Sequence, residues 1–339
     1  IPSAPKLAAV SSAFLKGRRR LSRRIDFFNF NMEVCWSQDG AQKAETGSGV
    51  CFHTIGCLLF YCLAYLKTRL KSERFQVASI NDICQFMEKF APMHLAEDWD
   101  NVGLLVGDRA LPVERVMTCL TVTPETVDEA VQRRADLIVT HHPIPFRPMK
   151  RLTTDTIAEG LVWQLARAGI SVYSPHTSFD SAKDGINQSL GQRLGVGELE
   201  SLIPQEDEMQ NLGAGRFGRL AEAQTLAQFV DNIKLNLSIE SVRVVDGAGG
   251  SVHRVAIACG SGGSFLGKAK ARGCDTLVTG EATFHTCLES QARGMSLVLL
   301  GHFASERFAV ETLAELLGAS FEPLEIWASA TERDPLSWM

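Results

Sequence analysis

From residue 77 onward, the chain alternates between two hydrophobic patterns. After Ser79, which suits a helix N-cap, apolar side chains recur at every third or fourth position as far as Phe90, which predicts an amphipathic helix. Continuous apolar runs such as Leu137–Thr140 are instead typical of strands covered on both faces of a parallel sheet. Further strands are predicted at 103–107, 116–122, 170–173, 241–245, 252–259, 276–279 and 297–300, and further helices at 124–131, 156–168, 226–237, 265–272, 282–293 and 305–317. This alternation predicts an α/β fold with mostly parallel sheets.

Two stretches of the chain resemble each other at a constant spacing. Residues 113–116 (VERV) recur as residues 252–255 (VHRV), and residues 136–140 (DLIVT) recur as residues 275–279 (DTLVT), in both cases 139 positions later (252 − 113 and 275 − 136). A duplicated strand–helix–strand unit indicates two related lobes with a site between them. We place the lobes at 77–200 and 201–339 and expect a connecting loop at 195–215.

A pair of histidines, His141 and His142, directly follows the predicted strand at 137–140. Functional sites in open α/β sheets gather at the carboxyl ends of strands. Neighbouring residues that leave a strand usually point to different sides, so two adjacent histidines suit two adjacent metal ions better than one. The other interpretation is a solvated or helix-capping pair, and the pair alone does not decide between the two.

Each half of the repeat is followed by a histidine with an acidic residue four positions later, namely His176 with Asp180 and His302 with Glu306. In a helix these positions share one face. Imidazole and carboxylate together suit zinc, manganese or iron(II), and a carboxylate can bridge two ions. Either pair alone is better explained as polar residues at a helix start. Both pairs after matching strands, with the histidine pair available, favour a metal site.

Two further groups of residues are candidates for a supporting role. The backbone amides of residues 260–264 (GSGGS), just before a predicted helix, suit an anion such as a phosphate, and a tight turn explains the segment equally well. In the second copy of the repeat, Glu281 occupies a position that corresponds to the histidine pair of the first copy. His285 lies four residues beyond Glu281. These two residues are candidates for orienting a ligand or facing the substrate, or are simply polar residues at a helix start.

Composition excludes some classes of protein. The chain has 339 residues, of which 45% are apolar and 22% are charged, so it can bury a sizeable core. Residues 1–76 carry 12 Lys/Arg and 5 Asp/Glu, a net charge of +7, so the rest carries −12 of the total of −5. An acidic body argues against sequence-independent binding of nucleic acid. The nine cysteines include no C-x-x-C motif, as is typical of free thiols in a reducing cytosol. We therefore expect a cytoplasmic protein with neither nucleic acid nor membrane as a partner.

The first 76 residues differ from the rest of the chain. A basic cluster at 16–24 is followed by an apolar stretch at 55–66, which is too short to span a bilayer comfortably. We interpret residues 1–76 as a disordered or non-native extension, the alternative being a targeting segment. A chain that starts at Val77 should then fold and bind metal like the full chain, as soluble yield and metal content would show. Loss of soluble protein on truncation would instead indicate a structural role.

Four segments, taken in order, resemble the NIF-three-like family, whose members are often named GTP cyclohydrolase 1 type 2 homologs. They are residues 99–107 (WDNVGLLVG), 136–143 (DLIVTHHP), 176–180 (HTSFD) and 301–306 (GHFASE). The resemblance begins near Ser79 and does not cover residues 1–76. It implies an α/β fold of two related lobes with a dinuclear metal centre between them. It also implies a homo-oligomer, since family members often form ring-shaped hexamers. The stretch at 195–215 leaves no room for the extra domain that some members insert between the lobes.

The resemblance also implies a set of metal ligands. Carried over by motif, the ligands are His141, His142, Asp180, His302 and Glu306, with Glu306 as a bridge between the two ions. His176 matches a family position close to the site rather than a ligand. Zinc, manganese or iron would suit these ligands.

The implied activity is hydrolysis of a small molecule. Two metal ions can activate a water and polarise the bond that it attacks, and Glu306 would be the catalytic residue. The substrate would be a nucleotide or another phosphate-bearing compound, with opening of the GTP imidazole ring as the family's named example. The alternative is a protein without catalytic activity that binds metal or a protein partner. Metal-dependent turnover that disappears in Glu306→Ala would favour the enzyme.

Overall fold

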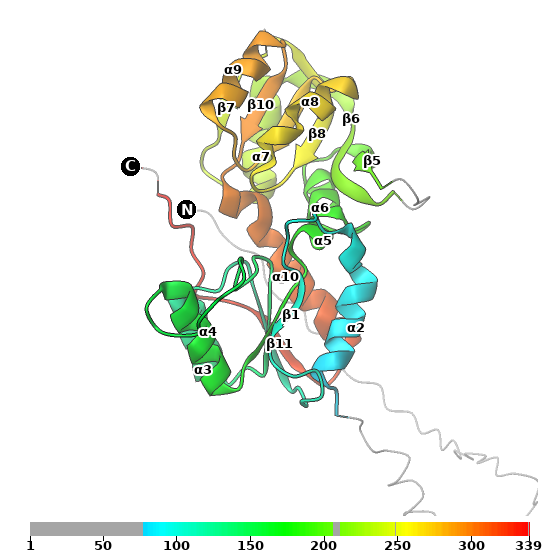
Figure 1. The fold of residues 1–339 in the computed structure, drawn as a ribbon. Helices are drawn as coiled ribbons and strands as arrows, with labels where there is room; N and C mark the ends of the chain where they lie inside the picture. Colours follow the sequence, from blue (N-terminus) through cyan, green and yellow to red (C-terminus); the bar gives the residue numbers. More distant parts are fainter. Residues whose placement is uncertain (1–76, 206–210, 248, 338) are drawn as a thin grey trace, which may run out of the picture. The chain divides into compact units, whose positions relative to one another are not determined.

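The computed structural model describes residues 77–205, 211–247, 249–337 and 339. The atypical segment at 1–76, with its basic cluster and its apolar stretch, lies outside the described residues. The described part is an α/β structure with two sheets, as the alternation of patterns predicted (Figure 1). Among its helices, none is both long enough and apolar enough to cross a membrane.

The first sheet has the strand order β1-β4-β3-β2-β11. Its strands are β1 (Gly103–Val106), β2 (Arg115–Cys119), β3 (Leu137–Thr140), β4 (Ser171–Ser174) and β11 (Glu325–Ala328). All neighbours are parallel except β1 and β4. One face packs against α3 (Pro124–Gln132) and α4 (Ile157–Ala168). The other face packs against α2 (Ile80–Phe90), which begins with the predicted Ser79 cap, and against α10 (His302–Ser320).

The second sheet has the strand order β5-β6-β8-β9-β10-β7. Its strands are β5 (Gly197–Pro204), β6 (Gly213–Thr225), β7 (Arg243–Val245), β8 (Ser251–Ala258), β9 (Thr276–Thr279) and β10 (Ser296–Leu299). One face carries α8 (Leu266–Ala271) and α9 (Phe284–Ala292), and α7 (Leu226–Leu237) packs on the other. The short elements η1 (Met93–Leu95), α5 (His176–Ser181), α6 (Ile186–Arg193) and η2 (Gly262–Phe265) complete the described structure.

Two sequence predictions about the second sheet are wrong. The sheet is mixed rather than mostly parallel, because only β8, β9 and β10 run parallel to one another. The predicted loop at 195–215 contains β5 and the start of β6. Glycines at 213, 215 and 218 and the charged Arg216 interrupt the apolar alternation that marks a strand. Long antiparallel pairing on both sides of β6 nevertheless holds this segment in the sheet.

The repeat in the sequence corresponds to a repeat in structure. The parallel pair β2–β3 aligns Val116 with Leu137, and the pair β8–β9 aligns Val255 with Thr276, which is the same register 139 positions later. In each copy an aspartate accepts two backbone hydrogen bonds of 2.8–3.0 Å, Asp136 from Glu114 and Arg115 and Asp275 from His253 and Arg254. The two sheets therefore share the register of one parallel strand pair and the same aspartate hydrogen bonds beside it.

The two sheets are connected through more than one segment. The expected boundary at 200/201 falls inside β5, and the C-terminal strand β11 pairs with β2 of the first sheet. Helix α10 leads from β10 of the second sheet to β11 of the first, and the Thr118 hydroxyl of β2 donates a hydrogen bond of 2.8 Å to the carbonyl of Val310 in α10. The C-terminal region therefore belongs structurally to both sheets.

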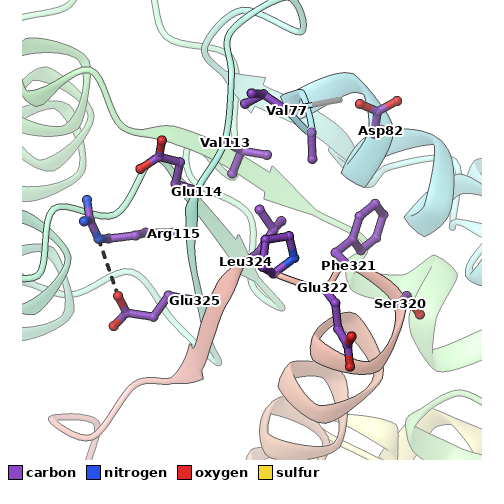
Figure 2. A pocket seen from close by; sticks show the side chains of 12 residues that line it. Val77, Asp82, Val113, Glu114, Arg115, Ser320, Phe321, Glu322, Leu324 and Glu325 are labelled. Carbon is purple, nitrogen blue, oxygen red and sulfur yellow. Dashed lines mark ion pairs between the residues drawn. The ribbon is translucent and has the colours of Figure 1, made fainter. Parts of the chain in front are cut away.

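A cavity of about 660 Å³ lies beside the first sheet, where α2 begins and α10 leads into β11 (Figure 2). Val113 and Leu324 contribute apolar side chains, and Arg115 forms an ion pair of 3.4 Å with Glu325 at its rim. Its lining contains no histidine or cysteine, so this cavity does not offer the ligands expected of a transition-metal site.

Candidate metal centre

The five predicted ligands come from three chain segments that follow strands. His141 and His142 directly follow β3, Asp180 lies on α5 after β4, and His302 and Glu306 lie one turn apart at the start of α10 after β10. Since the carboxyl ends of strands carry all three segments, the fold can direct these side chains to one place. The structure brings all five together in a single cluster.

Glu306 lies at the middle of the cluster. Its Oε2 atom is 3.2 Å from Nε2 of His142 and 3.2 Å from Nε2 of His302, and these two nitrogens are 3.3 Å apart. Its other oxygen, Oε1, faces His141 at 3.9 Å from Nε2. The two oxygens of one carboxylate therefore face different histidines.

His141 and Asp180 form the other side of the cluster. Nε2 of His141 lies 3.7 Å from Oδ1 of Asp180. The His141 side chain is only 3% exposed, and neither of its ring nitrogens has a hydrogen-bond partner among the described residues. A buried polar atom without a partner costs free energy, so an imidazole held in this way requires an explanation.

A bound divalent cation would provide that explanation. Ligand atoms about 2.1 Å from a metal ion lie about 3.0–3.5 Å from one another. The contacts among Glu306, His142 and His302 fall within this range, at 3.2–3.3 Å. Oε2 of Glu306 is also buried without a hydrogen bond of good geometry. The residues present therefore fit a divalent metal ion.

The protonation of two residues of the cluster, His141 and Glu306, is consistent with the same interpretation. Burial would raise the pKa of Glu306, but the imidazoles of His142 and His302 hold it well below its usual range. Burial and the nearby charge of Glu306 raise the pKa of Asp180. Burial holds the pKa of His141 well below its usual range, which leaves its ring neutral. The neutral ring of His141 and the ionised carboxylate of Glu306 are the forms in which these groups bind a cation. Glu306 raises the pKa of His302, so a cation that binds there displaces a proton from His302 and from Asp180.

Comparison with known proteins places the chain in a family. The sequence model of Duf34/NIF3 (NGG1p interacting factor 3) matches residues 78–335. The chain belongs to the Duf34/NIF3 family. It is 34% identical over 247 residues to a Clostridium acetobutylicum protein named GTP cyclohydrolase 1 type 2 homolog, which covers 73% of this chain and 92% of that protein. It is 30% identical to mouse NIF3-like protein 1, covering 77% of this chain and 91% of the relative.

A solved structure supports the fold of this Duf34/NIF3 chain. A Bacillus cereus protein related to NIF3 superposes with a TM-score of 0.70 at 25% identity, covering 78% of this chain and 100% of that one. The resemblance inferred from four sequence segments is thereby confirmed. The structure adds that the five predicted ligands, which come from three of those segments, meet in one cluster.

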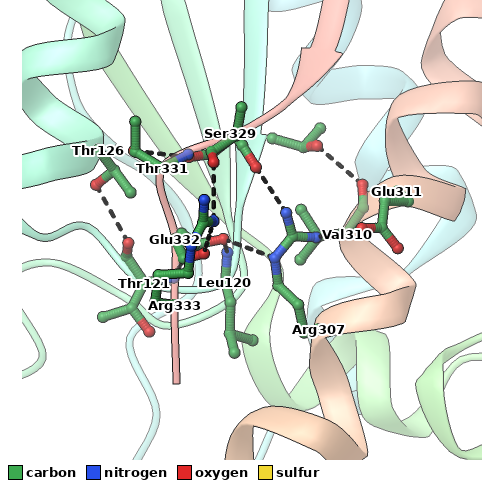
Figure 3. Close-up of polar contacts among 12 residues, drawn as sticks. Leu120, Thr121, Thr126, Arg307, Val310, Glu311, Ser329, Thr331, Glu332 and Arg333 are labelled. Atoms are coloured by element: carbon green, nitrogen blue, oxygen red, sulfur yellow. Dashed lines mark hydrogen bonds and ion pairs between the residues drawn. The ribbon is translucent and has the colours of Figure 1, made fainter. Parts of the chain in front are cut away.

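Hydrogen bonds that the sequence does not indicate support the cluster, and Figure 3 shows those around Glu332 and Arg307. Oγ1 of Thr121 lies 2.7 Å from Nδ1 of His142. The buried carboxylate of Glu332 accepts hydrogen bonds from the backbone N–H groups of Leu120 and Thr121, at 2.9 and 2.7 Å, and lies 3.2 Å from Nε of Arg307, the neighbour of Glu306. The C-terminal segment thus supports both His142 and α10. No local pattern marks residues so far apart in the chain.

Removing the Thr121 hydroxyl should weaken metal binding. Metal binding through Nε2 of His142 requires the proton on Nδ1, and Oγ1 of Thr121 is placed to accept it. We expect Thr121→Val to weaken metal affinity by about 10-fold, within the usual range for partners of metal-bound histidines. Titration with a competing chelator would measure the change. Thr312→Val, on the exposed side of α10, serves as the control, and equal affinities in the two variants would contradict the role of Thr121.

Asn187 of α6 supports the opposite side of the cluster. Its amide donates to the backbone carbonyl of Asp180 at 3.1 Å and accepts from the backbone N–H of Cys259 at 2.8 Å. The thiol of Cys259 in turn donates to Oδ1 of Asp180 at 3.2 Å. Asp180 is thereby oriented from the second sheet as well as from α5.

His176 lies beside the cluster, as the family resemblance implied. A ligand atom of His176 lies within 4.8 Å of those of His141 and His142. Its Nδ1 is 2.7 Å from Oδ1 of Asp100, whose side chain is fully buried and also accepts a hydrogen bond of 3.1 Å from the N–H of Thr177. Burial opposes ionisation of Asp100, but its hydrogen bonds with His176 and Thr177 lower its pKa to about 2. Asp100 is a site residue to which the sequence analysis assigned no role.

A cavity of about 610 Å³ opens onto the cluster and includes part of the predicted anion-binding turn. His142, Asp180, His302 and Glu306 line it together with the turn residues Gly260, Ser261, Gly262 and Ser264. A Cβ atom at Gly260 would lie 2.3 Å from Oε1 of Glu306, so only glycine permits this approach. Glu281 lies near the site, with Oε2 at 3.7 Å from Nδ1 of His302. His285 is exposed on α9 and does not line the cavity.

Proposed function

We propose that the histidine–carboxylate cluster binds two divalent metal ions and that the protein hydrolyses a nucleotide or another phosphate-bearing small molecule. The observation that carries the proposal is the buried His141 ring without partners, which faces two carboxylates beside a cavity. His142, His302 and Oε2 of Glu306 would hold one ion. His141, Asp180 and Oε1 of Glu306 would hold the other.

The ligand types indicate which metals would bind. Imidazole and carboxylate without thiolate suit zinc, manganese or iron(II). Glu306 would be shared by the two ions, because its two oxygens face different histidines. When bound, such ions lower the pKa of a water molecule to about 7 and polarise the bond that is attacked.

The other side of the cavity suits an anionic substrate. The turn at 260–264 and the side chain of Lys268 line the same cavity as the cluster. Lys268 is exposed and makes no ion pair with the described residues, so its charge is available for a phosphate. Relatives named GTP cyclohydrolase 1 type 2 homolog favour a nucleotide as the phosphate-bearing compound.

Metal analysis and a hydrolysis screen test the proposal. The purified full chain should hold about two equivalents of metal after loading, since one carboxylate can be shared between two ions. The double variant His142→Ala/Glu306→Ala should lose most of the metal, and full metal content in it would overturn the ligand assignment. Metal binding without turnover of GTP or of any compound in a broad phosphorylated panel would instead favour a protein without catalytic activity.

A negative charge on the turn should weaken binding of phosphate-bearing compounds. We expect Ser264→Asp to raise the dissociation constant for inorganic phosphate and for GTP by about 5- to 10-fold, because the new carboxylate repels the anion. Calorimetric titration would measure the change. Ser251→Asp, exposed at the opposite end of β8, is the matched control. Equal weakening in both variants would show that overall charge, not the turn, is responsible.

A further inference from the structure

Two large aromatic side chains are exposed where they line the cavity that opens onto the cluster. Trp99 is 60% exposed and Phe146 is 47% exposed, although both are residues that proteins usually bury. Their ring centroids lie 5.9 Å apart, and the ring of His176 meets both at steep angles, 76° to Trp99 and 80° to Phe146. Neither the metal cluster nor the anion-binding turn accounts for this exposed pair.

Hydrogen bonds of neighbouring residues position the two loops that carry the aromatic pair. The side-chain amide of Asn101, two positions after Trp99, donates a hydrogen bond of 2.7 Å to the backbone carbonyl of Pro145, which precedes Phe146. Asp100, between Trp99 and Asn101, is tied to His176 at 2.7 Å. The two loops are thus joined to each other and to the edge of the metal cluster. The backbone from which the two rings project is thus positioned before any ligand binds, which lowers the entropic cost of binding.

From this arrangement, and resting on the proposed function, we propose that Trp99 and Phe146 form a stacking surface for a planar heteroaromatic ring of the ligand. The preferred ligand class is then a nucleotide rather than a sugar phosphate. A ring inserted between two others needs about 7 Å between their planes, since stacked atoms lie about 3.5 Å apart. The 5.9 Å between the centroids of Trp99 and Phe146 is too short for insertion, so the ligand ring lies against the exposed faces.

The contents of the cavity favour a small ligand over a protein partner. Its volume of about 610 Å³ falls in the range of pockets for small molecules. It combines the aromatic pair with the metal cluster and with Ser264 and Lys268. A ring, a reacting group and an anionic group are the three parts that such a lining can recognise, and a nucleotide carries all three.

Binding of nucleoside monophosphates to the zinc-loaded full chain tests the stacking surface without requiring turnover. GMP, AMP, CMP and UMP are compared with ribose 5-phosphate by calorimetry. Stacking of a base on an aromatic side chain corresponds to roughly 10- to 100-fold in affinity. Trp99→Ala should therefore weaken the affinity for purine nucleotides by about this factor and leave the affinity for ribose 5-phosphate unchanged. Trp99→Phe should preserve affinity but remove the quenching of tryptophan fluorescence that stacking on Trp99 produces. Trp163→Ala, at a 42% exposed site on α4, is the control.

Each outcome decides the proposal. Tighter binding of nucleotides than of ribose 5-phosphate that is lost in Trp99→Ala and kept in Trp99→Phe supports the stacking surface. If this is observed and no nucleotide is hydrolysed, only the proposed hydrolase function fails. Equal binding of GMP and ribose 5-phosphate, or absence of binding by every nucleotide, overturns the stacking surface even if phosphate compounds are hydrolysed. A change in oligomeric state in Trp99→Ala with unaltered nucleotide affinity also overturns it, because the aromatic pair would then be a protein interface. Loss of metal in that variant argues against stacking as well.

Discussion

Glu306→Ala is expected to reduce the proposed metal-dependent hydrolysis by about 1,000-fold or more. Glu306 is 3% exposed, and its carboxylate is the group that the imidazoles of His141, His142 and His302 all face. Its removal deprives both proposed ions of a shared ligand and takes away the carboxylate that lies 3.2 Å from His142 and from His302. The chemistry that a divalent ion supplies amounts to several kcal/mol, which corresponds to this factor in rate.

Steady-state kinetics and metal analysis together would measure the effect of Glu306→Ala. The value of kcat should fall far more than KM rises, because Ser264 and Lys268, which are proposed to hold the substrate, remain in place. Glu315→Gln, on the exposed face of the same helix α10, should keep both the metal and the rate. Retained metal and retained turnover in Glu306→Ala would remove this residue from the proposed centre.

Arg216→Met is expected to destabilise the fold by about 3 kcal/mol or more. Arg216 is fully buried, and its guanidinium donates at 2.6–2.7 Å to the backbone carbonyls of Ala182, Gly213 and Gly215. Its Nε donates to the side chain of Gln188 at 3.1 Å. Methionine fills similar space but donates no hydrogen bond, so three buried carbonyls lose their donor. Each unsatisfied carbonyl lowers the free energy of unfolding by about 1–3 kcal/mol.

The same contacts connect Arg216 to the candidate site. Ala182 follows α5, which carries Asp180, and Gly215 lines the cavity that opens onto the cluster. We therefore expect Arg216→Met to lose metal affinity as well as stability, measured by chelator competition and by chemical denaturation. Arg219→Met, on the same strand β6 but exposed, is the matched control. A loss of less than 1 kcal/mol in Arg216→Met would contradict the structural role of the buried guanidinium.

The local sequence determined much of the fold and the positions of the candidate ligands. Helix α7 and strands β3 and β9 have the bounds that their hydrophobic patterns predicted, because short-range periodicity reflects which face of an element is buried. The repeat at 139 positions reappears as a shared register in β2–β3 and β8–β9. His141 and His142 directly follow β3, and His302 stands three positions after the end of β10. Their places after strands of the two repeated units were enough to expect them near one another.

Only the tertiary structure decided the rest. The pairing of β5 and β6, the return of β11 to the first sheet and the burial of Arg216 depend on contacts between segments far apart in the chain. The same is true of the support that Thr121, Asn187 and Glu332 give to the cluster, which joins His142 to the C-terminal segment and Asp180 to β8. A hydrophobic pattern reports the burial of each element but not which distant polar group faces it. Hydrogen-bond partners and sheet neighbours are therefore settled by packing, which no local pattern contains.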